Sequence, residues 1–258
     1  MRTPIGITTA ALAAFLFLTA PSADAAIVRG GEASDALFGL DDDNRDDPEI
    51  QPPNVTANQS LDNADLIEGL GGHDVLIGLL GSDTLIGGPG DDVIVGGTEQ
   101  ASSPNSDVQL GGTGNDVAVW AGGDGSDLFD GGVGQFDALV FGTIDKIDGI
   151  PTLSAATGKY RNTGLPTANV TGQGGFCTIE AVADPLERGV DFLIRFFARS
   201  SGNLLVTVRT RDVEQLFCTS QAGGAITYAD LTEPDPQLVE VSLDEVEALN
   251  RTVRAIIR

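Results

Sequence analysis

The sequence predicts an all-β protein with a minor α part. We expect a coil of parallel strands over residues 60–142, followed by an antiparallel β domain over residues 143–258 that ends in a helix. Three observations lead to this fold class. A short motif recurs every nine residues in the first region, apolar residues alternate around a turn in the second, and apolar residues recur at helical spacing near the C-terminus.

Residues 1–25 have the layout of a secretory signal peptide. A basic start at Met1-Arg2 precedes an apolar run and a small-residue site at Ala23-Asp24-Ala25. We therefore expect cleavage near Ala25 and a mature chain that is secreted, periplasmic or on the cell surface. The alternative is an uncleaved anchor, although a spanning helix usually needs about 20 apolar residues. No later segment is long and apolar enough to predict a membrane span in the mature chain.

Charge is distributed unevenly along the chain. The whole sequence carries a net charge of -24. Residues 26–150 hold 24 acidic against 3 basic residues, whereas residues 151–258 hold 13 against 10. This charge argues against nucleic acid as a partner, because its phosphates need basic neutralisation. The acidic half instead favours a cationic ligand.

The repeated unit consists of six turn residues, the last of which is an aspartate, followed by an apolar triplet. The first four aspartates keep a nine-residue spacing. Later units contain six extra residues between Thr98 and Ser106, two after the triplet 117–119, and one in the last turn. Insertions that leave the glycines and aspartates in place are typical of a structural repeat. The eight aspartates are Asp65, Asp74, Asp83, Asp92, Asp107, Asp116, Asp127 and Asp137.

The units "GGPGDDVIV", "GGTGNDVAV" and "GGDGSDLFD" resemble the nonapeptide G-G-x-G-x-D-x-U-x of RTX (repeats-in-toxin), hemolysin-type calcium-binding proteins. The resemblance covers about residues 60–142. It implies a parallel β-roll in which two turns and two strands make a coil of 18 residues. It also implies that Ca²⁺ is held between successive turns, with Asp74 near Asp92 and Asp65 near Asp83.

The expected metal ligands are the repeat aspartates and the carbonyl groups of the repeat glycines. Glycine adopts the positive φ that such turns need, and Ca²⁺ prefers oxygen ligands. The alternative is a metal-free solenoid with solvated aspartates, but carboxylates stacked about 4.8 Å apart repel one another without a counter-ion. The expected ligands are Asp65, Gly69, Gly71, Asp74, Gly78, Asp83, Gly87, Gly88, Gly90, Asp92, Gly96, Gly111, Gly112, Gly114, Asp116, Gly122, Gly123, Gly125, Asp127 and Asp137.

The apolar triplets predict which faces of the roll are buried. The middle residue of each triplet points to the opposite face from its two neighbours, so we expect it in the core. The neighbours should face outward, yet they are apolar too: Leu66, Val75, Ile77, Ile86, Val93, Val95, Val117 and Val119. We therefore expect at least one outer face to be covered, by the C-terminal region or by a second copy of the chain.

Residues 26–59, before the repeat, are acidic and are expected to form a linker. Residues 143–258, after the repeat, predict a domain of a different kind. Alternating apolar residues around the turn "SSGN" predict a β-hairpin, with Phe192, Ile194 and Phe196 facing Leu204, Val206 and Val208. Cys177 and Cys218 flank this hairpin, and export favours a disulfide between them; two free buried thiols are the alternative. Ser242 and Glu245 form a capping box that predicts the terminal helix.

No enzyme motif is present. His73 is the single histidine, and neither H-E-x-x-H nor G-x-S-x-G occurs. We therefore expect a non-enzymatic, exported calcium-binding protein that serves adhesion, matrix or surface attachment, with a protein or glycan partner bound by the C-terminal region. The alternative is a secreted carbohydrate-active enzyme or its calcium-dependent accessory module. The scarcity of aromatic residues, with Trp120 the only tryptophan, argues against this alternative.

Overall fold

The computed structural model describes residues 27–32, 36–38, 64–78, 81–97, 106–120, 125–145, 152–154, 159–161, 167–169, 174–182 and 189–242, together with Leu249, Arg251 and Val253. The predicted signal peptide 1–25 lies outside the described residues. So do most of the predicted linker 26–59, the glycines Gly122 and Gly123, and Glu245 of the predicted capping box.

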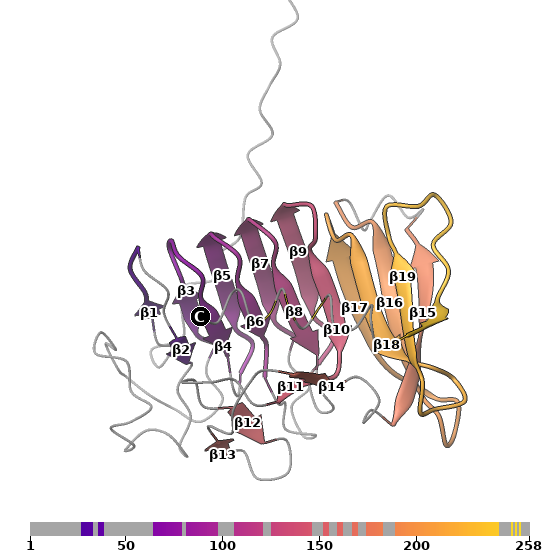
Figure 1. Ribbon diagram of the computed structural model, residues 1–258. Coiled ribbons are helices and arrows are strands. Elements are labelled where there is room, and N and C mark those ends of the chain that lie inside the picture. Colours follow the sequence, from indigo (N-terminus) through magenta and orange to yellow (C-terminus); the bar gives the residue numbers. More distant parts are fainter. Residues whose placement is uncertain are drawn as a thin grey trace, which may run out of the picture.

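Two eight-stranded sheets form the body of the molecule (Figure 1). The first sheet has the order β1 (Ile27–Arg29), β3 (Leu66–Glu68), β5 (Thr84–Pro89), β7 (Val108–Thr113), β9 (Leu128–Val133), β17 (Leu204–Arg211), β16 (Phe192–Ala198) and β15 (Gly175–Ala181). The second sheet has the order β2 (Ala36–Phe38), β4 (Val75–Ile77), β6 (Val93–Val95), β8 (Val117–Trp120), β10 (Ala138–Phe141), β18 (Gln215–Thr219), β19 (Ile226–Asp230) and β20 (Val239–Val241).

Two small antiparallel pairs complete the described strands. They join β11 (Thr143–Asp145) to β14 (Thr167–Asn169), and β12 (Thr152–Ser154) to β13 (Lys159–Arg161). The prediction of an all-β protein that contains parallel strands is therefore confirmed.

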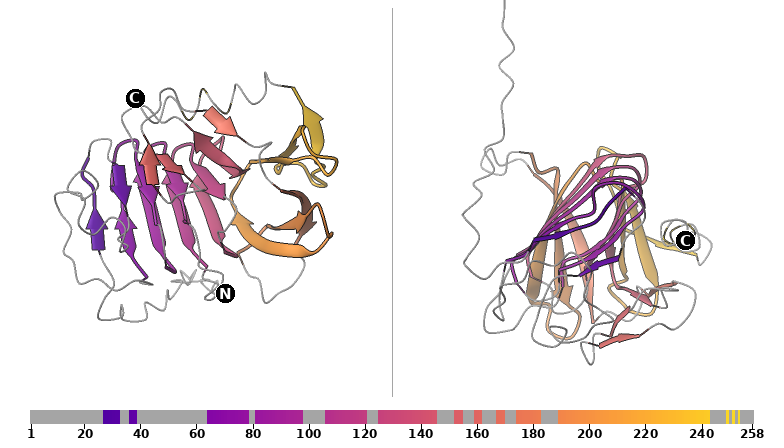
Figure 2. Two further views of the ribbon diagram at one scale, coloured as in Figure 1. Left: turned by 90° about the horizontal axis from the view of Figure 1, so that it is seen from below. Right: turned by 90° about the vertical axis from the view of Figure 1, so that its left-hand side faces the viewer.

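Strands β1 to β10 form a parallel roll, because the chain alternates between the two sheets and each strand pairs with the strand two elements later. Leu66 is aligned with Thr84, and the next pair, Thr84 with Val108, stays in parallel register across the six-residue insertion. Figure 2 shows the two sheets stacked face to face along the roll. The insertions therefore lengthen turns and leave the strand pairing intact.

Residues expected as a linker contribute to this roll. Strand β1 pairs with β3, and β2 pairs with β4, both in parallel. Val28 and Leu37 are buried in the same cluster as Ile67 and Leu76. The physical reason is that "IVR" and "ALF" are apolar enough to extend both sheets, although the acidic residues between and after them suggested a solvated segment.

The C-terminal region continues both sheets of the roll. Strand β17 pairs in parallel with β9, and β18 pairs in parallel with β10. Beyond them the pairing becomes antiparallel, from β17 through β16 to β15 and from β18 through β19 to β20. The roll and the C-terminal region therefore share one interior between the same two sheets (Figure 1).

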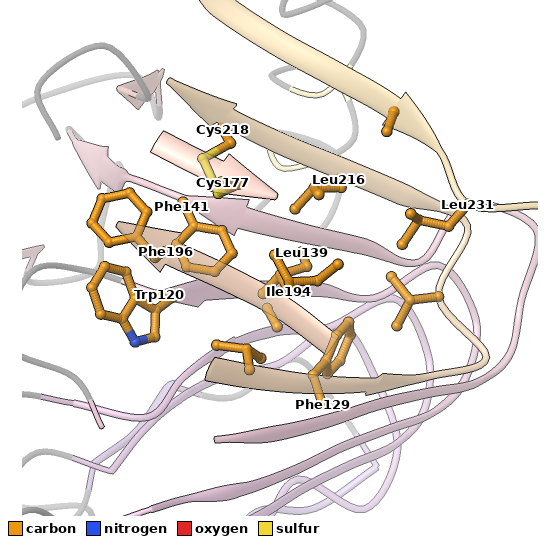
Figure 3. Close-up of a cluster of buried hydrophobic side chains, with 14 of the residues drawn as sticks. Trp120, Phe129, Leu139, Phe141, Cys177, Ile194, Phe196, Leu216, Cys218 and Leu231 are labelled. Carbon is orange, nitrogen blue, oxygen red and sulfur yellow. A yellow bond between two sulfur atoms is a disulfide. The ribbon is translucent and has the colours of Figure 1, made fainter. Parts of the chain in front are cut away.

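The interior contains the middle residues of the strands, as the alternation predicts. Each has 0–1% of its surface exposed: Ile67, Leu76, Leu85, Ile94, Ala118, Phe129 and Leu139. Where the roll meets the C-terminal strands, the rings of Trp120, Phe141 and Phe196 group together with centroids 5.0–5.3 Å apart (Figure 3). Aromatic pairs at this distance add about 0.5–1.5 kcal/mol each beyond area burial.

The outer face of the second sheet is also covered. Five of the eight apolar residues predicted to face outward are buried in one cluster: Val75, Ile77, Val93, Val117 and Val119. Leu249 and Val253, which have helical backbone and are fully buried, belong to the same cluster. The expectation of a covered outer face is confirmed for this sheet, and the C-terminal chain provides the cover.

The predicted hairpin forms, but two of its residues pair differently from the expectation. Phe192 pairs with Thr210. Ile194 pairs with Val208 and Phe196 with Val206, as expected. A register shift between Phe196 and Phe197 then places Leu204 opposite Phe197, and 50% of the Leu204 surface is exposed. The expectation that Leu204 pairs with the face formed by Phe192, Ile194 and Phe196 is wrong, because a shift of one residue turns a side chain to the other face of the sheet.

The disulfide joins the two sheets. Cys177 on β15 and Cys218 on β18 are bonded across the interior, with their Cα atoms 6.1 Å apart. Both residues are buried, at 5% and 0% exposure. The predicted disulfide is therefore present.

Among the described residues, no helix has the length and apolar character needed to cross a membrane.

Candidate metal centre

The repeat aspartates form two rows along the roll, one at each edge. Each aspartate immediately precedes its strand, so its position is fixed by the strand pairing. We call the set that precedes first-sheet strands the first row: Asp65, Asp83, Asp107 and Asp127. We call the set that precedes second-sheet strands the second row: Asp74, Asp92, Asp116 and Asp137. All eight are buried, with 0–3% of their surface exposed.

Each row is connected by hydrogen bonds between successive coils. The backbone N–H of Asp74 donates to Oδ1 of Asp92, and the N–H of Asp92 donates to Oδ1 of Asp116, both at 2.8 Å. The first row repeats this contact from Asp65 to Asp83 at 2.7 Å. The expected proximity of units two apart is therefore confirmed by direct contacts.

The second carboxylate oxygen is the chemically unusual atom. In Asp92, Asp116 and Asp137, Oδ2 is buried and has no hydrogen-bond partner among the described residues. Burying a carboxylate oxygen without a compensating partner is unfavourable. These oxygens therefore have the environment expected of ligands to a cation.

Glycine at the first turn position leaves room for this oxygen. A Cβ on Gly87 would collide with Oδ2 of Asp92 and would lie 2.7 Å from the carbonyl oxygen of Gly111 in the next coil. Gly111 has the same relationship to Asp116 and to the carbonyl oxygen of Gly131. A carboxylate oxygen and a carbonyl oxygen thus converge beside each of these glycines.

Glycines at the second and fourth positions meet carbonyl groups of the preceding coil. Gly88 and Gly90 have φ angles of +108° and +143°. A Cβ on either would collide with the carbonyl oxygen of Leu70 or Gly72, respectively. The third position differs, because the carbonyl of Pro89 accepts a hydrogen bond from Gly72 at 3.1 Å. The carbonyls of positions one, two and four therefore point between the coils.

Burial dominates the electrostatics of the second row. It raises the pKa of Asp116 to about 8 and the pKa values of Asp92 and Asp137 to about 7. Hydrogen bonds from the preceding N–H groups oppose this shift, while neighbouring carboxylates reinforce it. A bound cation would favour the ionised forms.

Some predicted ligands have a different place from the one expected. Gly71 occupies the variable third position, whereas Gly72 has the φ of +122° that matches Gly90. The carbonyl of Gly125 accepts a hydrogen bond from Nε1 of Trp120 at 3.0 Å, so it faces the aromatic cluster. Gly122 and Gly123 lie outside the described residues.

The fifth turn position, treated as variable, carries a second set of hydrogen bonds. The N–H of Asp91 donates to Nδ1 of His73, and the N–H of Asn115 donates to Oδ1 of Asp91. The N–H of Gln135 donates to Oδ1 of Asn115. The signal was present in the sequence, because this position is polar with an acceptor atom in seven of the units. His73 is thus exposed but is part of a structural ladder.

An additional repeat unit precedes those that the sequence analysis found. The letters "GGEASDALF", residues 30–38, fit the repeat with alanine in place of the fourth glycine. The N–H of Gly71 donates to the carbonyl of Gly31, and Ala36 is aligned with Val75. Its Asp35 lies outside the described residues.

The donor set fits a hard cation. Among the described residues, no group of three His, Cys, Asp or Glu side chains is close enough to hold a metal ion. The atoms that converge between the coils are carboxylate oxygens and backbone carbonyl oxygens. Oxygen-only sets of this kind suit Ca²⁺, which accepts six to eight oxygen ligands in flexible geometry.

These features define a parallel β-roll with buried, metal-ligand-like aspartates. Residues 62–99 match the family described as the RTX calcium-binding nonapeptide repeat (4 copies). The family resemblance is confirmed for this segment, and RTX calcium-binding repeats bind Ca²⁺. Comparison of the chain with curated proteins and with solved structures finds no match.

Proposed function

We propose that this chain is an exported, non-enzymatic calcium-binding protein in which Ca²⁺ ions held between successive coils order the acidic roll. The observation that carries the proposal is the buried Oδ2 atom of Asp92, Asp116 and Asp137, which has no hydrogen-bond partner among the described residues. A cation bound to these oxygens would compensate for the cost of burying them, and it would do so without a hydrogen-bond donor.

The ligands in this proposal are the carboxylates of both aspartate rows and the carbonyls of turn positions one, two and four. One ion between two coils would receive a carboxylate oxygen such as Oδ2 of Asp92 and a carbonyl such as that of Gly111, which converge beside Gly87. The full set is the one given by the sequence, with Gly72 in place of Gly71 and without Gly125, whose carbonyl accepts a hydrogen bond from Trp120.

Charge supports a role for the cation in folding. Successive carboxylates of a row lie in neighbouring coils and are removed from water, so their mutual repulsion is weakly screened. The net charge of -24 adds to this repulsion. Ion binding to the folded roll would therefore contribute directly to the free energy of folding.

Ca²⁺ suits this site better than Mg²⁺. Mg²⁺ demands near-ideal octahedral geometry and retains several water molecules, whereas Ca²⁺ tolerates irregular sets of protein oxygens. The convergent oxygens here are carboxylate oxygens of buried aspartates and main-chain carbonyl oxygens, a donor set that suits Ca²⁺. Extracellular calcium modules bind at about 10⁻⁴–10⁻³ M, which matches an exported protein.

Export, location and use extend this proposal. RTX repeat proteins are typically extracellular or secreted, and the N-terminal segment has the layout of a signal peptide. We place the mature chain outside the cytoplasm, where the ordered roll would serve adhesion, matrix or surface attachment. The C-terminal region would contact the protein or glycan partner. Trp120 is only 4% exposed, so the single tryptophan provides no sugar-binding platform.

The test is calorimetric titration of the full chain with CaCl₂, alongside far-ultraviolet circular dichroism in chelator and in calcium. We expect calcium binding with a gain of β signal, and no such gain with MgCl₂. Asp92→Asn plus Asp116→Asn should reduce the number of bound ions. The charge-matched control, Glu233→Gln plus Asp235→Asn, changes two exposed acids and should leave binding unchanged. Full β signal in chelator without measurable binding would contradict the proposal.

A further inference from the structure

The second aspartate row does not end with the last repeat unit. The N–H of Asp116 donates to Oδ1 of Asp137 at 2.7 Å. In turn, the N–H of Asp137 donates to Oε2 of Glu214 at 2.8 Å, although 77 residues separate the two. Ala138 is aligned with Gln215 in the parallel pairing of β10 and β18. Glu214, in the C-terminal region, therefore occupies the place that an aspartate of the next coil would occupy.

A backbone carbonyl of the C-terminal region also takes a repeat position. In the roll, the space beside the first-position Gly111 is shared by the carboxylate of Asp116 and the carbonyl oxygen of Gly131. Beside Gly131, the corresponding neighbours are the carboxyl group of Asp137 and the carbonyl oxygen of Asp212. The strand register agrees, because Asp130 is aligned with Arg211.

The link between β17 and β18 is thus a shortened version of the repeat turn. It keeps the first position at Asp212 and the sixth at Glu214, with only Val213 between them. Asp212 has a φ of 49°, and its N–H donates to Oδ2 of Asp191 at 2.9 Å. A non-glycine residue is therefore held in the left-handed region, which fixes the direction of its peptide groups.

We propose that the C-terminal β domain completes a calcium site at the end of the second row, in which Asp137 and Glu214 supply carboxylates and Asp212 supplies its main-chain carbonyl. This inference rests on the proposed calcium function of the roll. The independent observation that points to a ligand is Oδ2 of Asp137, which belongs to a fully buried residue and has no hydrogen-bond partner among the described residues.

The chemistry of this end site follows that of the roll. Two carboxylates balance the charge of one Ca²⁺, and the carbonyl adds a neutral oxygen. Glutamate is one methylene longer than aspartate, which lets Glu214 reach the row from a turn that has three residues in place of six. The site therefore depends on Glu214, a residue that does not belong to a glycine-rich repeat unit.

The same end of the first row lacks this arrangement. Arg209 is aligned with Leu128, so Val208 takes the place beside Asp127 where the next aspartate would lie. Val208 is 1% exposed and belongs to the apolar interior. The C-terminal domain would therefore be joined to the roll by calcium at one edge and by apolar packing at the other.

A consequence is that calcium fixes the C-terminal domain on the roll as well as the coils on one another. The ion would connect ligands from β10 and from the β17–β18 link, which are far apart in the sequence. Removing it should loosen this junction first, because the junction has the shortened turn and a single site.

The test compares the number of calcium ions bound per chain by calorimetry and by equilibrium dialysis. Glu214→Gln keeps an oxygen that can accept the N–H of Asp137 and removes only the charge, so the fold is preserved. We expect it to bind one ion fewer than the wild type. Two controls should bind the full number, because Glu233→Gln and Asp235→Asn each change an exposed acid outside the site.

The outcomes separate this inference from the proposed function. If Glu214→Gln binds as many ions as the wild type with equal affinity, while Asp92→Asn plus Asp116→Asn binds fewer, the end site is overturned and calcium binding by the roll stands. If the wild type binds no calcium, the proposed function fails and this site fails with it. A loss in Glu214→Gln together with full binding in both controls supports the end site.

Discussion

Cys177 and Cys218 are bonded across the interior and tie the edge strand of the first sheet, β15, to β18, an inner strand of the second sheet. Their sequence separation is 41 residues. The loop that they close contains the hairpin of β16 and β17, which pairs directly with the last coil of the roll. The disulfide therefore stabilises the part of the C-terminal region that extends the roll.

Replacing both cysteines by alanine should lower the free energy of unfolding by about 4 kcal/mol, the loop-closure entropy for a loop of this length. The measurement is guanidinium unfolding in saturating calcium, with wild type as the reference. A loss below about 1 kcal/mol would mean that the unfolded chain is already restricted in this region, and would contradict the prediction.

Leu70→Gly should stabilise the protein. Leu70 stands at a second turn position with a φ of +76° and is 43% exposed, whereas Gly88, Gly112 and Gly132 occupy that position in other coils. The left-handed conformation costs an L-residue about 1–2 kcal/mol, and glycine loses about 0.5–1 kcal/mol in entropy. We expect a net gain of about 0.5 kcal/mol in denaturant unfolding. Leu70→Ala keeps a Cβ and serves as the control; an equal gain there would contradict the explanation.

Gly112→Ala should destabilise the roll more than a glycine substitution in open space. A Cβ at Gly112, where φ is +113°, would collide with the carbonyl oxygen of Gly88. Overpacking of about 1–3 kcal/mol adds to the strain of about 1–2 kcal/mol. Gly202→Ala is the matched control, because Gly202 has a φ of +70° but no heavy atom within 4 Å of the added Cβ. Equal thermal unfolding temperatures for both variants would refute the steric argument.

Without calcium, stability should fall as the pH rises from about 4 to about 8. Burial raises the pKa values of Asp92, Asp116 and Asp137 to about 7 or 8 from an ordinary value of 3.8. The folded state therefore binds more protons than the unfolded state in this window, so the free energy of unfolding decreases with pH. Saturating calcium favours the ionised carboxylates and should remove this decrease.

Unfolding in chelator and in calcium, at pH 5 and at pH 8, measures this effect. The variant with Asp92, Asp116 and Asp137 all changed to Asn should lose the pH dependence in chelator. Stability that rises with pH in the calcium-free wild type would show that these carboxylates are not the controlling groups.

The roll was predictable because its signal is local and periodic. The nine-residue spacing from Asp65 to Asp92 predicts that units two apart pair, as Leu66 does with Thr84, and the two-residue alternation places Leu76 and Ile94 inside. The contacts between aspartates two units apart follow from these two periods. Each unit makes the same contacts as the next, so a pattern within the chain translates directly into spatial neighbours.

Other parts were missed for identifiable reasons. The unit at residues 30–38 is separated from the main repeat by a long acidic stretch and lacks its fourth glycine, so it did not stand out. The register shift between Phe196 and Phe197 has no marker in the alternation, which made the expectation for Leu204 wrong. The placement of this unit and the register shift both depend on which strand pairs with these residues, and that pairing joins residues far apart in the sequence.

The sequence by itself determined the repeat, its aspartate rows, its glycine turns and the cation they suit, because turn geometry and side-chain alternation are properties of neighbouring residues. Only the tertiary structure decided how the roll ends. The parallel pairing of β10 with β18 brings Glu214 to Asp137, and the covered face of the second sheet brings Leu249 to the roll. Such contacts arise when distant strands must satisfy open backbone edges and bury apolar faces, and no local pattern records them.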